Sequence, residues 1–286
     1  MKKRILILAG GVASRMKKAA ENVLVEQKLI EQADTLTKGM IGVGKSGKSL
    51  IDYQLFNAQL AGFEEVLLLL HPNDDFTEPY YENLMNSNSL WGLKIVFSRQ
   101  YISEGRLKPS GTADAVLQAL EQQEDWQKGR IIILNSDNLY SQKALELLWN
   151  CPESNALISY DRDSLEFPVE RIKAFAVIQE SSDEYLKSII EKPSDEVIDE
   201  IYRETGRIGV SMNAFMIDAE QLLYFLRITP FNPDRNEKEL PTTISMLISE
   251  QPKAVKCIPL SENVPDLTSK NDLAIVQKYL INHFQF

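Results

Sequence analysis

Near its N-terminus the chain reads Arg4-Ile5-Leu6-Ile7-Leu8-Ala9-Gly10-Gly11-Val12-Ala13-Ser14-Arg15. The continuous apolar run at its start predicts a strand buried on both faces, as in a parallel sheet covered by helices. Two glycines follow at once, and the lack of a Cβ lets backbone N–H groups approach a phosphate closely. Ser14 can donate its hydroxyl, and Arg15 can bind pyrophosphate charge through its planar guanidinium. These residues predict a phosphate-binding loop, although by themselves they fit a plain turn after a strand equally well.

The first 165 residues or so alternate between strand-like apolar runs and helix-like segments. Predicted strands cover residues 4–9, 66–70, 93–97, 130–134 and 156–160, and predicted helices cover residues 49–61, 112–120 and 141–149. Strands separated by helices indicate βαβ units and a mostly parallel, doubly wound sheet. The later part predicts strands at 174–179, 186–190, 210–217 and 254–258, and helices at 194–203, 219–226, 241–249 and 271–282. We therefore expect an α/β fold with a mixed, mainly parallel sheet flanked by helices.

No linker rich in Pro, Gly or Ser divides the chain, so we expect a single domain over residues 1–286. The charged residues 17–34 have a helix-like composition and lie between the first loop and the predicted helix over 49–61. We interpret residues 17–37 as an insertion.

The composition excludes several classes of protein. Of 286 residues 44% are hydrophobic and 25% charged, and the formal net charge is −10 without a dense Lys/Arg stripe, which argues against nucleic-acid binding. No apolar run approaches the ~18–20 residues that span a membrane. Cys151 and Cys257 lack metal-ligand spacing, and with only His71 and His283 beside them a zinc site is excluded. The simpler interpretation is that both cysteines are free thiols without a function in a cytoplasmic protein, and a disulfide between them is the alternative.

Polar residues stand where predicted elements begin or end. Pro109-Ser110-Gly111-Thr112-Ala113 opens a helix, whose N–H groups favour an anionic ligand, or else forms a routine helix cap. Asp137 follows the strand over 130–134, where open α/β sheets bind ligands, and a single carboxylate there suits Mg²⁺. Asp266, in a turn before the last helix, is a second candidate metal ligand, although a helix-capping acid also fits.

Two further positions suit a phosphorylated ligand. Glu191-Lys192-Pro193 ends a predicted strand, and its lysine is either a phosphate ligand or a solvated surface charge. Asn213 lies inside an apolar strand, where its amide must find partners in a ligand or in neighbouring backbone.

A rival motif is Gly42-Val43-Gly44-Lys45-Ser46-Gly47-Lys48-Ser49, which matches the P-loop pattern and precedes a predicted helix. A P-loop needs a buried strand before it, and only Met40 and Ile41 stand there. A P-loop kinase or NTPase is therefore the alternative function.

Taken in order, the motifs resemble the sugar-nucleotide pyrophosphorylase family, which includes glucose-1-phosphate thymidylyl- and uridylyltransferases. The resemblance covers roughly residues 4 to 275 and rests on an ordered set of short stretches: Leu8-Ala9-Gly10-Gly11, Ser14-Arg15, Lys38 with Leu50-Ile51-Asp52-Tyr53, Ala61-Gly62-Phe63, Pro109-Ser110-Gly111-Thr112-Ala113, Asn135-Ser136-Asp137-Asn138 and Glu191-Lys192-Pro193. It implies a Rossmann-like nucleotidyltransferase fold, with a nucleotide-binding half up to about residue 160 and a sugar-phosphate-binding half beyond it.

The resemblance also implies a role for each matching residue. It gives nucleotide binding to Leu8, Ala9, Gly10, Gly11, Ser14, Gly111 and Thr112; catalysis to Arg15, Lys38 and Asp137; sugar-phosphate binding to Glu191, Lys192 and Asn213; and a Mg²⁺ site to Asp137 and Asp266. The implied substrates are a nucleoside triphosphate and a sugar 1-phosphate or similar phosphorylated small molecule, joined to an NDP-sugar with release of pyrophosphate. No nucleic-acid or membrane partner is expected, and a homo-oligomer is left open.

Three departures from the family pattern matter. Ala13 stands where the loop usually has glycine, Thr37 replaces the proline before the lysine, and the insertion separates Arg15 from Lys38. A non-catalytic relative that binds a sugar nucleotide is therefore a further alternative.

Overall fold

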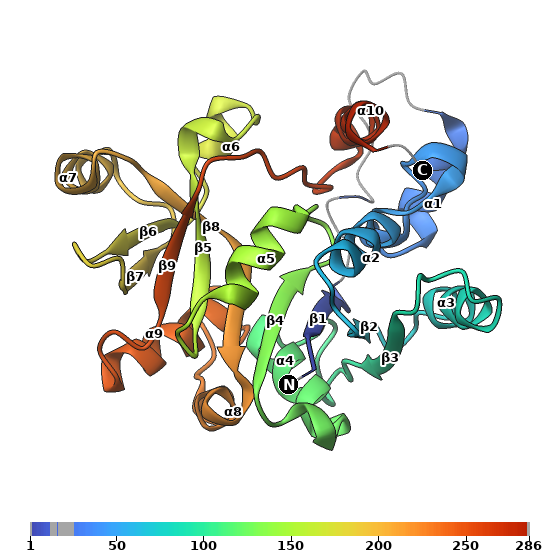
Figure 1. The fold of residues 1–286 in the computed structure, drawn as a ribbon, viewed down its shortest axis with the longest axis horizontal. Helices are drawn as coiled ribbons and strands as arrows, with labels where there is room; N and C mark the ends of the chain where they lie inside the picture. Colours follow the sequence, from blue (N-terminus) through green and yellow to red (C-terminus); the bar gives the residue numbers. More distant parts are fainter. Residues whose placement is uncertain (1, 12–15, 17–25, 285–286) are drawn as a thin grey trace.

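The computed structural model describes residues 2–11, 16 and 26–284. These residues form one nine-stranded sheet flanked by helices (Figure 1). Its strands are β1 (Arg4–Ala9), β2 (Glu65–Leu70), β3 (Lys94–Arg99), β4 (Arg130–Asn135), β5 (Ala156–Asp161), β6 (Val177–Glu180), β7 (Leu186–Ile190), β8 (Gly209–Asp218) and β9 (Lys256–Leu260). The strand order is β3-β2-β1-β4-β8-β5-β9, and β6 pairs with both β7 and β8.

Most strands point the same way. β1 pairs in parallel with β2 and β4, and β2 pairs in parallel with β3. β8 runs antiparallel to β4, β5 and β6, so these three share the direction of β1, and β9 is parallel to β5. The predicted mixed, mainly parallel sheet is confirmed. The carboxyl ends of β1, β2 and β4 therefore lie along one edge, where such sheets bind ligands.

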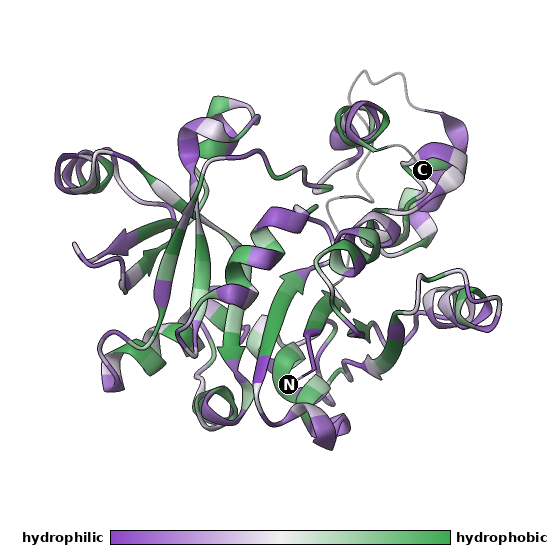
Figure 2. Ribbon diagram, viewed as in Figure 1, coloured by the Kyte–Doolittle hydropathy of each residue, from purple (hydrophilic) through white to green (hydrophobic). Residues whose placement is uncertain are grey.

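Helices cover both faces of the sheet. They are α1 (Gln27–Thr35), α2 (Leu50–Leu60), α3 (Thr77–Asn86), α4 (Thr112–Gln122), α5 (Gln142–Asn150), α6 (Val169–Ile172), α7 (Asp195–Thr205), α8 (Ala219–Ile228), α9 (Leu240–Glu250) and α10 (Leu273–His283). Ile5 and Ile7 of β1 belong to a core with α2 and α5, whereas Leu6 belongs to a core with α4, α8 and α9. Figure 2 shows the apolar colour gathered on the central strands. Burial on both faces explains the uninterrupted apolar runs of β1 and β2.

The sequence pattern does not reveal α3. Only Thr77 and Tyr81 of this helix are buried, so it has no apolar stripe to read. Its start is fixed by Asp74, whose carboxylate accepts hydrogen bonds from the N–H groups of Phe76 and Thr77 at 3.1 and 2.8 Å. α1 lies inside the expected insertion, whose status as an insertion stays a prediction. Its Asp34 pairs with Lys270 at 2.7 Å, which ties it to the C-terminal part of the chain.

The P-loop interpretation is wrong. The segment before Gly42 is a single 3₁₀ turn over Lys38–Met40 and not a strand. Within the motif the N–H of Gly44 donates to the carbonyl of Lys48 at 2.8 Å, and the N–H of Lys45 donates to the Tyr53 hydroxyl at 3.2 Å. Backbone donors that a P-loop would turn toward a phosphate are thus used inside the protein, and Ser49 serves as the cap of α2.

Two expectations from composition can be compared with this fold. Within the described ranges, none of the helices is both long enough and apolar enough to span a bilayer. Cys151 and Cys257 are both buried free thiols, so the disulfide alternative is wrong. The cytoplasmic location stays a prediction.

Candidate functional site

Two cavities open where the central strands end, and they meet beyond β4. The first, of about 450 Å³, lies between the ends of β1 and β4 and the start of α4. The second, of about 320 Å³, lies between the β4 end, β7 and β8. Asn135 and Asp137 line both cavities. Two ligand-sized spaces thus share one carboxylate.

The first cavity gathers most of the residues predicted to bind a nucleotide. Its lining includes Leu8, Ala9, Gly10, Gly11, Lys38, Gly111, Thr112 and Asp137. Ser14 and Arg15 lie outside the described residues, so their contribution stays a prediction. Residues from three separate parts of the chain nevertheless come together around one space.

Gly111 holds the α4 start against the neighbouring loop. Its φ is +103°, and a Cβ at this position would lie 2.4 Å from the backbone oxygen of Lys238. That oxygen accepts the N–H of Ala113 at 2.9 Å, and the Thr112 hydroxyl accepts the N–H of Leu240 at 2.9 Å. The α4 N-terminus therefore offers a ligand fewer free donors than its sequence suggests, because Lys238 uses one of them.

Lys38 reaches across the first cavity to Asp137. Its Nζ lies 2.9 Å from Oδ2 of Asp137, and both side chains are largely buried. Gly39 permits this approach, because a Cβ there would lie 2.7 Å from both the Ile51 side chain and the Ser136 backbone oxygen. The predicted catalytic lysine and aspartate are therefore an ion pair at the junction of the two cavities.

A short backbone ladder sets Asp266 beside Asp137. The N–H of Leu267 donates to the Asp137 carbonyl, and the N–H of Leu139 donates to the Pro265 carbonyl, each at 2.8 Å. Asn138 and Asp266 form an antiparallel bridge between them. The two predicted metal ligands thus come from segments far apart in sequence but locked together in space.

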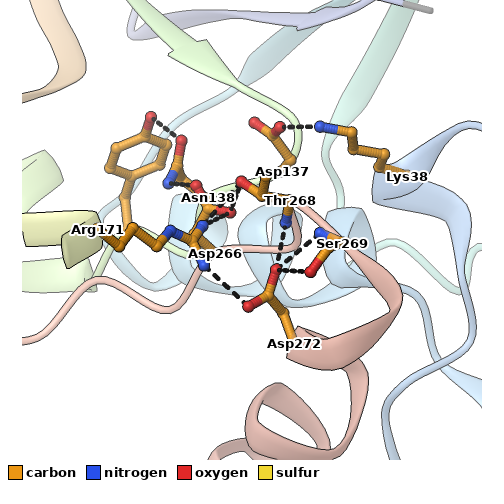
Figure 3. A network of polar contacts seen from close by, with 9 residues as sticks. Lys38, Asp137, Asn138, Arg171, Asp266, Thr268, Ser269 and Asp272 are labelled. Carbon is orange, nitrogen blue, oxygen red and sulfur yellow. Dashed lines mark hydrogen bonds and ion pairs between the residues drawn. The ribbon is translucent and has the colours of Figure 1, made fainter. Parts of the chain in front are cut away.

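Both oxygens of Asp266 have partners (Figure 3). Oδ1 accepts from Nη2 of Arg171 at 2.5 Å and from the Thr268 hydroxyl, and Oδ2 accepts from the side-chain amide of Asn138 at 3.1 Å. Burial raises the pKa of Asp266 and the charge of Asp137 raises it further, whereas Arg171 acts in the opposite direction. The buried carboxyl of Asp266 therefore needs a nearby cation to stay ionised.

Asn213 projects into the second cavity from a bulge in β8. The register between β5 and β8 shifts at this point, and Asn213 has a φ of +56°. Asparagine tolerates this left-handed conformation better than most residues, and bulges re-aim side chains at functional sites. The amide that the sequence marked as needing a partner therefore lines the cavity and is not buried in the sheet.

The Glu191-Lys192 motif contributes one of its two predicted residues to the second cavity. Glu191 lines it, half exposed, and its carboxylate lies 3.6 Å from Nη2 of Arg235. Lys192 is exposed, has a φ of +46° and is not among the residues that line either cavity. The structure therefore does not bring Lys192 to the site.

The model of the nucleotidyl transferase family matches residues 25–273 of the chain. The chain belongs to this family. The match confirms the resemblance to sugar-nucleotide pyrophosphorylases at the level of the family. It begins after the loop at Leu8–Arg15.

Curated relatives of this chain include glucose-1-phosphate adenylyltransferases. The enzyme of Bifidobacterium animalis subsp. lactis (strain AD011) is 25% identical over 205 residues, which cover 66% of this chain and 48% of the relative. The enzyme of Rhodopseudomonas palustris (strain TIE-1) is 25% identical over 232 residues, covering 80% and 50%. The chain thus spans about half the length of the curated relatives it matches. A UDP-glucose pyrophosphorylase solved with UDP-glucose superposes with a TM-score of 0.69 and 15% identity, covering 99% of this chain and 100% of the other, which confirms the fold.

The carboxylates at the junction suit a metal held jointly with a substrate. Among the described residues, no group of three or more His, Cys, Asp or Glu side chains could hold a metal by itself. Magnesium typically takes one or two carboxylates and completes its shell with water and substrate phosphates. Asp137 and Asp266 fit that donor set, with oxygen ligands only.

Sequence reasoning missed several residues that line the cavities. Gln100 is 3% exposed, and its side-chain N–H₂ donates to the Gly111 carbonyl and to Asp114, each at 3.0 Å. Its side-chain oxygen faces Gly10, since a Cβ on Gly10 would lie 3.2 Å from it. Arg171 lines the second cavity. Gln100 ends a strand as Asp137 does, and that position was a usable signal, whereas the lone Arg171 in a charged segment gave none.

Proposed function

We propose that this chain transfers a nucleotidyl group from a nucleoside triphosphate to a sugar 1-phosphate or a similar phosphorylated small molecule. The observation that carries this proposal is the junction of two cavities at Asp137. One cavity is lined by Gly10, Gly11 and the α4 start, which suit the nucleotide. The other is lined by Glu191, Asn213 and Asp266, which suit a polar acceptor. An acceptor phosphate in the second space can reach a nucleotide in the first at the shared carboxylate.

The reaction is an in-line displacement at phosphorus. An oxygen of the acceptor phosphate forms a bond to the α-phosphorus of the nucleotide, and the bond from that phosphorus to the bridging oxygen breaks. Pyrophosphate leaves with that oxygen and its electron pair. The protein therefore contributes positioning and charge stabilisation and needs no nucleophile. The arrangement agrees with this, since both thiols are buried and neither lines one of the two cavities.

Two charged side chains and a magnesium ion would carry the stabilisation. Lys38 sits at the junction and can exchange its contact with Asp137 for a phosphate oxygen. Arg15 would bind the leaving pyrophosphate. A magnesium ion held by Asp137 and Asp266 would neutralise phosphate charge when bound.

The names of the relatives suggest the first substrates to test. Because the curated relatives are glucose-1-phosphate adenylyltransferases and the solved structure is a UDP-glucose pyrophosphorylase, glucose 1-phosphate is the first acceptor, with ATP and UTP as donors. A thermal-shift panel of nucleoside triphosphates and NDP-sugars would extend the choice. The hits then enter a pyrophosphate-release assay with Mg²⁺.

The decisive variant is Asp137→Asn, which removes the shared charge with little change in shape. We expect it to lose pyrophosphate release, while Asp199→Asn on the exposed face of α7 keeps it. Equal activity of Asp137→Asn and the parent would overturn the proposal. Ligand-induced stabilisation without product from any substrate pair would favour a non-catalytic relative.

A further inference from the structure

Arg171 contacts two carboxylates and a hydroxyl at the junction. Its Nη2 contacts Asp266 at 2.5 Å and the Thr268 hydroxyl at 2.7 Å, and its Nη1 contacts Asp272 at 2.8 Å. Its guanidinium lies 4.6 Å from the centre of the Phe167 ring. The side chain is 22% exposed and lines the second cavity. The guanidinium is thus held between two carboxylates at the edge of a ligand-sized space (Figure 3).

Each of the two junction carboxylates has its own protein cation. Lys38 contacts Asp137, and Arg171 contacts Asp266. Without these cations, two neighbouring carboxylates in a largely buried site would repel each other, and one would tend to take up a proton. The two side chains therefore supply the positive charge that this pair of acids requires.

We propose that Arg171 competes with a divalent cation for Asp266, so that the protein provides its own cation there until a metal takes its place. The inference rests on the proposed function, because it takes Asp137 and Asp266 as the carboxylates that hold the metal. Both oxygens of Asp266 already have partners, so a metal must displace at least one of them. Asn138 and Thr268 are neutral, whereas Arg171 is a full charge that both occupies Oδ1 and repels a second cation.

Asp272 makes the exchange feasible. It keeps a contact with Nη1 of Arg171 when Nη2 leaves Asp266, so the guanidinium is not left unpaired in a partly buried place. Asp272 is itself fixed by the N–H groups of Thr268 and Ser269 at 3.0 and 2.7 Å. The released half of the guanidinium then faces the second cavity. Among the described residues that line this cavity, Arg171 is the one Lys or Arg side chain.

A merely structural role for Arg171 predicts the opposite effect on metal affinity. If Arg171 only braced Asp266 in position, its removal would let the carboxylate move and would weaken metal binding. If Arg171 competes with the metal, its removal strengthens binding. The sign of the change therefore separates the two roles.

The test is a titration of the folded protein with Mn²⁺ alone, with free Mn²⁺ followed by electron paramagnetic resonance. We expect Arg171→Gln to bind Mn²⁺ at least about tenfold more tightly than the parent, since a cation in contact with a carboxylate changes its affinity for another cation, the proton, by about ten- to a thousandfold. Arg171→Lys should give a smaller gain, because the lysine keeps the positive charge but lacks the planar fork that contacts both Asp266 and Asp272. Arg171→Lys also provides a test of the inference if Arg171→Gln does not fold.

The matched control is Arg207→Gln. Arg207 pairs with Glu180 at 2.7 Å and is 23% exposed, close to the 22% of Arg171, but it lines neither cavity. It should leave Mn²⁺ affinity unchanged. Asp266→Asn in the Arg171→Gln background should abolish the gain, which places the competition at that carboxylate.

The failures are distinguishable. Suppose that Asp137→Asn abolishes Mn²⁺ binding, and that Arg171→Gln binds Mn²⁺ no more tightly than the parent. This result would overturn the inference but keep the metal site. Absence of Mn²⁺ binding in every variant would also overturn the inference, whereas the proposed function would still be tested by pyrophosphate release with Mg²⁺ and both substrates.

Discussion

Lys38 and Asp137 are 99 positions apart in sequence, yet Nζ of Lys38 lies 2.9 Å from Oδ2 of Asp137. The contact is possible because Gly39 lets the Lys38 turn press against the end of β4. In the proposed reaction the lysine turns from this carboxylate to a phosphate as charge develops. A lysine that is already paired at the junction needs little rearrangement to do so.

We therefore expect Lys38→Met to lower kcat for pyrophosphate release by about 100-fold or more, because a positioned charge at the reacting phosphorus is lost. The control is Lys48→Met, which removes the lysine of the false P-loop motif. That variant should keep the parent rate. A large effect of Lys48→Met together with a mild effect of Lys38→Met would contradict the placement of the site.

Asn213 gives a prediction for the acceptor side. Asn213→Gly removes the amide but tolerates the φ of +56°, so the bulge in β8 can persist. Loss of one or two hydrogen bonds to the acceptor should raise its KM about five- to thirtyfold, at about 1–2 kcal/mol, with the KM of the nucleotide unchanged. Steady-state kinetics, with each substrate varied in turn, measure the KM of the acceptor and the KM of the nucleotide. Equal rises in the two KM values would show that Asn213 acts on the whole fold and not on the acceptor.

The parts of the site that could be predicted from the sequence are those whose signal is local. Asp137 was identifiable because an uninterrupted apolar run predicts β4, and the end of such a strand is a known place for ligands. Asn213 was identifiable because an amide inside an apolar strand must find a partner. In both cases the evidence lies within a few residues of the position itself.

Other features depend on partners that lie far away in the sequence. The role of Arg171 depends on its contacts with Asp266 and Asp272, which lie 95 and 101 positions later in the sequence. The exposure of Lys192 follows from the path of the chain after β7, which no local pattern encodes. The P-loop pattern misled for the converse reason, since its residues match while the strand that such a loop requires is absent.

A substitution at Gly111 tests the packing that shapes the first cavity. Gly111→Ala places a Cβ against the backbone oxygen of Lys238 and also strains a φ of +103°. We expect a loss of about 2–4 kcal/mol in the free energy of unfolding, from overpacking and strain together. Gly105→Ala is the control, because its φ is +80° but nothing lies within 4 Å of the added Cβ. It should lose only the strain energy of about 1 kcal/mol. The free energy of unfolding of both variants is measured in urea. Equal losses for Gly111→Ala and Gly105→Ala would contradict this prediction.

Glu65 gives a prediction for stability against pH. Burial alone would raise its pKa, but hydrogen bonds from Lys2 and Arg4 and the charge of Lys94 outweigh burial and lower it from 4.5 to about 2. A carboxyl whose pKa is lower in the folded state stabilises the fold above its ordinary pKa, and this stabilisation disappears as the pH falls through the folded value. The contribution of Glu65 should therefore be complete near neutral pH and decline between about pH 4.5 and about pH 2.

Glu65→Gln removes this charge from a residue that is 4% exposed and takes away the carboxylate that pairs with Arg4 at 2.8 Å. We expect it to lower the free energy of unfolding by about 1–3 kcal/mol at pH 7, with the difference from the parent shrinking as the pH approaches 2. Denaturant unfolding at a series of pH values measures this difference. The neighbouring exposed Glu64→Gln is the control and should show little change at any pH. A difference between Glu65→Gln and the parent that stayed constant down to pH 2 would show that its cause is lost packing, and that the charge of Glu65 contributes nothing to stability.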